Sequence, residues 1–176
     1  MSATESANSA WKLSEEEGGI LAGRWWKWAV STPDDRCPVR DTTGEHAAWK
    51  QPADLWFLAG TYGGRVERRC DVDARRPHFF PVLNMRSPAK DRQNMAVAHA
   101  EASLNGIPLP LREFSGFFRA GLVRSFAWGV WGGLAPLAPG QYVLEISGRS
   151  SNGFWVDTTY HLNAQAQSAI PGRCHA

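Results

Sequence analysis

The stretch FWVDTTYHL, residues 154–162, gives the clearest indication of the fold. Apolar and polar side chains alternate along it, and a period of two predicts a β-strand with one face on a core. The expected core face consists of Phe154, Val156, Thr158, Tyr160 and Leu162. The expected outer face consists of Trp155, Asp157, Thr159 and His161. This segment therefore predicts a half-covered strand whose outer surface is chemically mixed.

Seven further segments have the composition of strands and are separated by turn residues. They are residues 55–61, 65–72, 78–84, 98–104, 107–111, 122–131 and 141–147. Asn105 and Gly106 are the pair favoured in a type I′ turn, which predicts a hairpin between the fourth and fifth of these segments. Pro81 cannot donate to a ladder, so its strand is expected at an edge or a bulge. The run LWFLAGT, residues 55–61, is apolar on both faces and predicts a central strand.

Two helical pieces are expected beside the strands. Ser14 and Glu17 form a capping box, which predicts a helix from there to about Val30. Three glycines weaken this helix, so docking rather than helix propensity must hold it. A short second helix is expected over residues 87–96. Together with eight strands, these pieces predict a mainly β fold, an antiparallel β-sandwich or jelly roll.

The length of 176 residues fits one domain. Residues 1–10 are small and polar and predict a disordered tail, residues 11–164 form the single β-rich domain, and residues 165–176 form a C-terminal tail. The N-terminus lacks the cationic and apolar regions of a secretory signal, which indicates either a cytosolic chain or a mature form.

Charge and composition argue against several classes of partner. The chain has 19 basic and 17 acidic residues, too even a balance to favour nucleic acid or an anionic membrane. No apolar run approaches the roughly 18 residues that span a bilayer. Cys37 and Cys70 either form a disulfide or stay free, and Cys174 lies near the C-terminus. No ligand spacing for zinc is present, and no cofactor is predicted.

Several segments together resemble an uncharacterised family of small, often secreted bacterial proteins with a glycine-rich β pattern. The matching pieces are RWWKW, CPVRDTTG, LWFLAGTYGG followed by ERRC, HFFPVLN, the PLAPG turn and FWVDTTYHL, between Arg24 and Ala164. The resemblance implies a shared β fold and brings no known activity with it. Members generally carry a signal peptide and a cysteine shortly after the DTTG element, where this chain has Ala47 and Ala48.

The tryptophan content suggests a binding function. Nine tryptophans exceed what a core of this size needs, so some are expected on the surface. An exposed indole beside polar groups forms a platform for a sugar ring. The predicted ligand-binding residues are Trp155, Asp157, Thr159, His161, Trp128 and Trp131. The leading hypothesis is therefore a binding module for a carbohydrate or other small polar ligand; a half-solvated strand under a loop is the alternative interpretation of the mixed face.

An enzyme and a structural protein are the competing hypotheses. A hydrolase or isomerase would use His99, Glu101, Asp157 or His161 as acid or base in a sandwich cleft. Asp157 and His161 lie about 13 Å apart along one strand and cannot pair directly. No GxSxG or HExxH motif is present. A structural or self-associating protein would instead expose a large apolar patch.

Two charged segments are expected to be structural. Residues Asp34, Asp35, Asp41 and Glu45 lie in one loop, where aspartates more often cap turns than hold Ca²⁺, so no metal site is predicted. Residues Arg65, Arg68, Arg69, Arg75 and Arg76 are interleaved with acids and are expected to form solvated ion pairs.

Overall fold

The computed structural model describes residues 9–88 and 96–166, which form one long helix, a 3₁₀ turn and nine strands. The helical elements are α2 (Glu15–Val30) and η1 (Asp34–Arg36). The strands are β1 (Trp56–Phe57), β2 (Gly64–Asp73), β3 (His78–Ser87), β4 (Val97–Leu104), β5 (Ile107–Pro108), β6 (Arg112–Ala120), β7 (Val123–Leu134), β8 (Gly140–Ser150) and β9 (Trp155–Gln165). The short second helix was predicted in a segment that lies almost entirely outside these residues.

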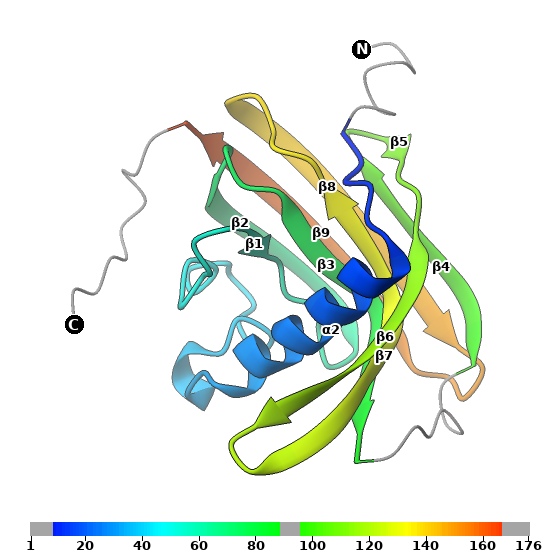
Figure 1. The fold of residues 1–176 in the computed structure, drawn as a ribbon. Helices are drawn as coiled ribbons and strands as arrows, with labels where there is room; N and C mark the ends of the chain where they lie inside the picture. Colours follow the sequence, from blue (N-terminus) through cyan, green and yellow to red (C-terminus); the bar gives the residue numbers. More distant parts are fainter. Residues whose placement is uncertain (1–8, 89–95, 167–176) are drawn as a thin grey trace.

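The strands form two sheets that face each other, so the mainly β sandwich prediction is confirmed (Figure 1). The four-stranded sheet has the order β1-β3-β7-β6, and the five-stranded sheet has the order β2-β9-β8-β4-β5. Most neighbours are antiparallel, but β1 runs parallel to β3, and β2 runs parallel to β9. Apolar side chains of both sheets, among them Phe80, Leu144 and Leu162, form the core between them.

The helix α2 covers the other face of the four-stranded sheet, across β6 and β7 (Figure 1). Its N-terminus has the predicted capping box, with Ser14 Oγ accepting from the Glu17 backbone and the Glu17 carboxylate accepting from the Ser14 backbone. Gly19 and Gly116 touch across this contact, where a Cβ on either would lie 2.4 Å from a backbone oxygen of the opposite element. The glycines that weaken the helix thus allow its close docking.

The strand predictions are confirmed in part. Asn105 and Gly106 both have positive φ in the turn between β4 and β5, as a type I′ hairpin requires. The β3–β7 pairing shifts register between Pro81 and Leu83, so the bulge alternative is correct. The prediction of a central strand over 55–61 is wrong: only Trp56 and Phe57 pair, at the edge of the sheet. One face of this segment, with Leu55, Phe57 and Ala59, packs in the cluster beneath the helix, and the other, with Trp56 and Leu58, packs in the core between the sheets.

The strand β6 was not predicted. Its side chains alternate, with Phe114 and Phe118 buried against the helix, but the central pair Ser115 and Gly116 has the composition of a turn. Ala10 was predicted to lie in the disordered tail, but it forms an isolated antiparallel bridge with Leu134. Among the described residues, no helix is long and apolar enough to cross a membrane.

Candidate functional site

The outer face of the five-stranded sheet carries the predicted site residues of the last strand. The alternating burial along β9 matches the sequence pattern, with Val156, Thr158, Tyr160 and Leu162 buried. The strand register aligns the outer residues of neighbouring strands in rows: Ser147 of β8 lies between Glu101 of β4 and Asp157 of β9. This face is therefore a continuous polar surface over four strands.

Cross-strand pairs fix much of this polar surface. The Arg65 guanidinium binds the Asp157 carboxylate at 2.8 Å, and His161 Nε2 lies 2.6 Å from Glu67 Oε1. Two residues further along β9, the Asn163 amide donates to Asp71 at 2.7 Å. These contacts join β2 to β9, which run parallel. They hold the side chains of Asp157 and His161 in set positions on the sheet.

A shallow hollow of about 360 Å³ lies in this face over β4, β8 and β9. Its polar lining residues are Glu101, Ser103, Glu145, Ser147 and Asp157, and we call this space the acidic hollow. Three carboxylates and two hydroxyls line it, and no basic side chain does. Only weak contacts engage two of the carboxylates, since Glu145 accepts from Ser103 at 3.5 Å and Glu101 lies 3.5 Å from His99. The acidic hollow therefore presents unused hydrogen-bond acceptors.

The tryptophans are distributed differently from the prediction. Trp155 is 41% exposed and lies on the outer face, two residues from Asp157. The prediction of exposed Trp128 and Trp131 is wrong, because they are only 3% and 1% exposed. Trp131 stacks on Phe79 beneath the helix, with ring centroids 4.8 Å apart, and the Trp128 indole donates to the Glu113 carboxylate. Much of the tryptophan excess thus serves the helix–sheet core.

The four acid–base candidates do not all lie in one cleft. His99 and Glu101 lie together on β4, and His161 pairs with Glu67 on β2 rather than with Asp157. Neither histidine lines the acidic hollow, although Glu101 and Asp157 do. The structure thus supplies two histidine–carboxylate pairs on an open sheet face.

One charged residue has a role that sequence reasoning missed. Arg68 was expected in a solvated ion pair, but it is only 2% exposed and points into the sandwich. Its guanidinium donates to the carbonyl oxygens of Val39, Asp41, Ala59 and Gly60 and to the Tyr160 hydroxyl. Burial raises the pKa of that tyrosine to about 12. The alternation of β2 contained the signal, since position 68 is in phase with the buried positions 66 and 72.

The acidic loop is organised as a turn. The Asp41 carboxylate accepts hydrogen bonds from the backbone of Thr43, Gly44 and His46, so its oxygens are used locally. No group of three or more potential metal ligands occurs among the described residues. Cys37 and Cys70 are both free thiols.

Comparison of the chain with protein-family models, with curated proteins and with solved structures found no match. The function is therefore argued from the geometry of the sites.

Proposed function

We propose that the protein is a β-sandwich binding module for a small carbohydrate, held on the outer face of the five-stranded sheet. The observation that carries this proposal is the exposed Trp155 next to the acidic hollow. A sugar ring needs an apolar surface for its C–H face and polar groups for its hydroxyls, and these two features supply both. Trp155 and Asp157 project from the same face of β9, about 7 Å apart along the strand.

The charge of the acidic hollow sets the class of sugar. Carboxylates accept hydrogen bonds from sugar hydroxyls, and such charge-assisted bonds are stronger than neutral ones. Of the three carboxylates only Asp157 pairs with an arginine, and no basic side chain lines the hollow, so it repels a uronic acid and attracts an ammonium group. Neutral and amino sugars are therefore the favoured ligands, and acidic sugars are excluded.

The acid–base enzyme and the self-associating protein are less well supported. Neither histidine lines the acidic hollow, and of the two histidine–carboxylate pairs only Glu101 does, so no histidine–carboxylate pair faces a substrate there. The exposed large apolar side chains of the described residues are mostly spread over separate elements, and the largest group, Phe117, Leu122 and Val123, is confined to the β6–β7 hairpin.

Isothermal titration with a series of neutral, amino and uronic oligosaccharides tests the proposal. We expect the amino sugar to bind best and the uronic sugar not at all. Trp155→Ala should weaken binding about tenfold, the loss of a stacked aromatic contact worth ~1.4 kcal/mol. Phe117→Ala removes an aromatic ring of similar exposure from β6 of the four-stranded sheet and is the matched control.

Replacement of the Glu145 carboxylate tests whether the charge of the acidic hollow, rather than its shape, selects the sugar. Glu145→Gln keeps the size of the side chain and should weaken the amino sugar more than the neutral one. Binding of all three sugar classes with equal affinity, or a Trp155→Ala variant with unchanged affinity, would refute the proposal.

A further inference from the structure

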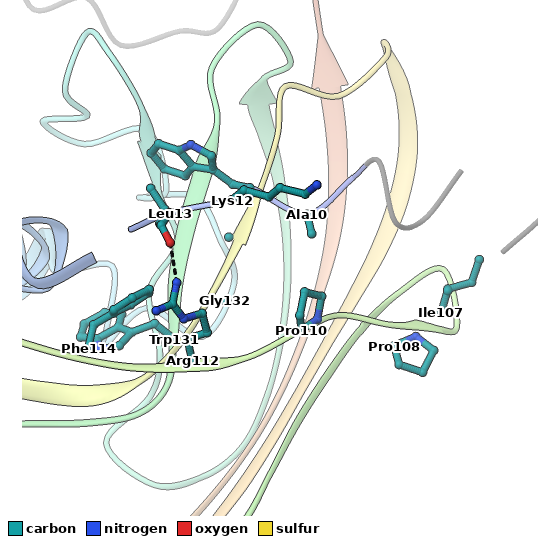
Figure 2. A pocket seen from close by; sticks show the side chains of 12 residues that line it. Ala10, Lys12, Leu13, Ile107, Pro108, Pro110, Arg112, Phe114, Trp131 and Gly132 are labelled. Atoms are coloured by element: carbon teal, nitrogen blue, oxygen red, sulfur yellow. Dashed lines mark hydrogen bonds between the residues drawn. The ribbon is translucent and has the colours of Figure 1, made fainter. Parts of the chain in front are cut away.

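A second cavity, of about 520 Å³, lies where the N-terminal segment crosses the end of β7. We call it the N-terminal pocket, and its walls come from residues 10–13, 107–114 and 131–133. Figure 2 shows Lys12 on one side, Pro110 on the opposite side and Arg112 at one end. It is separate from the polar lining of the acidic hollow and shares only Pro108 with that site.

Backbone hydrogen bonds hold the wall formed by the N-terminal segment. Ala10 bridges Leu134 in antiparallel fashion, and the Trp11 backbone N–H donates to the Gly133 carbonyl at 3.0 Å. Gly133 also makes room for this segment, since a Cβ there would lie 3.1 Å from the Trp11 Cβ. The pocket is therefore preformed, and preformed sites bind ligands with less loss of conformational entropy.

The walls of the pocket are mostly apolar. The apolar lining side chains larger than alanine are Trp11, Leu13, Ile107, Pro108, Pro110, Phe114 and Trp131. Two of them belong to the aromatic core beneath the helix, where Phe79 lies against both Phe114 and Trp131. The packed core thus fixes part of the pocket surface. Such a surface favours an apolar ligand body, since burial of apolar area stabilises the complex.

The charged residues of the pocket all have the same sign. Lys12 and Arg112 are its only charged lining residues, and within the described chain neither forms an ion pair with a carboxylate. Arg112 donates one N–H to the Leu13 carbonyl at 2.5 Å and lies 4.9 Å from the Phe114 ring centroid. A guanidinium has five N–H groups, so it retains donors for an anion.

We propose that the N-terminal pocket binds a small amphipathic carboxylate, with its apolar body against the aromatic and proline walls and its carboxylate toward Lys12 and Arg112. The two cations supply the charge complementarity, and the volume lies in the range of small-molecule sites. This inference goes beyond the proposed sugar site, because the two sites favour ligands of opposite charge. An experiment that refutes the carboxylate site therefore does not refute the sugar site, and the reverse also holds.

The test compares three ligands with the same ten-carbon chain: decanoate, decanol and decyltrimethylammonium. Their affinities for the full chain are measured by titration calorimetry below their micellar concentrations. We expect decanoate to bind most tightly, decanol more weakly and the cation least. Competition with the amino sugar should be absent, since the polar lining of the acidic hollow lies outside the pocket.

Two variants distinguish the contribution of the Lys12 charge to binding from that of the apolar cavity. Lys12→Gln should weaken decanoate about fivefold and leave decanol unchanged, which corresponds to the ~1 kcal/mol between opposite charges about 4 Å apart in water. Lys27→Gln, at an exposed lysine that does not line the pocket, is the control. Gly133→Val displaces Trp11 and should weaken decanoate and decanol alike. Circular dichroism checks that this variant is folded; Lys12 is exposed, so its replacement does not endanger folding.

Equal affinity for decanoate and decanol, or an unchanged decanoate affinity in Lys12→Gln, would overturn the proposal. Absence of binding to any of the three chains would overturn it as well. Sedimentation velocity distinguishes another occupant: a dimer that Gly133→Val dissociates would assign the pocket to a second copy of this chain instead of a small anion.

Discussion

Replacement of Arg68 by methionine should unfold the protein at much milder conditions. The change leaves the carbonyl oxygens of Val39, Asp41 and Gly60 without the donor that now reaches them inside the sandwich. A buried polar group that loses its partner costs about 1–3 kcal/mol. With some entry of water, we expect a loss of about 4 kcal/mol in the free energy of unfolding, or about 8–16 °C in Tm for a chain of this size.

Urea denaturation followed by tryptophan fluorescence measures this loss. Arg69→Met is the matched control, because its side chain is exposed and pairs with Glu67 at 3.6 Å; we expect a change below about 0.5 kcal/mol. Tyr160→Phe removes the hydroxyl that Arg68 contacts at 2.8 Å and should cost about 2 kcal/mol. The double variant should lose less than the sum of the two single losses, by about 1 kcal/mol.

One result would refute this reasoning. Methionine has an apolar side chain of similar length, and removal of a buried charge sometimes leaves stability unchanged when the site repacks. If Arg68→Met and Arg69→Met unfold at the same urea concentration, the hydrogen bonds of Arg68 do not contribute net stability. The residue would then be a tolerated buried charge.

Two further predictions concern pH and helix docking. His78 is fully buried, and burial lowers its pKa to about 4. Between about pH 6.5 and pH 4, therefore, only the unfolded chain takes up a proton on this histidine. The free energy of unfolding should fall over this range, as the pH decreases, by up to about 3 kcal/mol. His78→Phe should remove this part of the fall in urea titrations at pH 7 and 4.5, and an equal fall in both proteins would contradict the prediction. Gly116→Ala places a Cβ 2.4 Å from the Gly19 carbonyl oxygen and should cost about 2 kcal/mol in thermal unfolding. Ser115→Ala, at an exposed neighbour, should cost below about 0.5 kcal/mol, and equal losses would exclude the steric reason.

Features decided by near neighbours in the sequence were predictable. The capping box of Ser14 and Glu17 and the turn at Asn105 and Gly106 depend on residues at most three positions apart. The outer face of β9 was also predictable, because alternation alone separates Trp155 from Val156. These signals are read without knowledge of the partner strands.

Features that depend on residues distant in the sequence were not predictable. Residues 55–59 are buried by the helix on one face and by the inter-sheet core on the other, and the apolar run does not reveal that only two of them pair, at the edge of the sheet. Gly116 suggests a turn in the sequence, and only the close contact with Gly19 of the helix explains a glycine in this strand. The exposure of a tryptophan depends on what covers it, and for Trp131 the cover comes from α2 and from Phe79. The N-terminal pocket needs three separate segments, one of which begins in the expected tail.

The parallel pairing of β2 with β9 has a consequence for how the protein is made. β2 ends at residue 73, and its only partner strand in the described sheets begins at residue 155. During synthesis the edge of β2 stays open until residues 155–165 have left the ribosome, and such long-range closure is slow. A chain cut before β9 leaves both β2 and β8 without their shared neighbour. β9 is thus the strand that joins β2 to the rest of the sheet, and the facing edges of β2 and β8 stay accessible to chaperones and proteases until β9 has been translated.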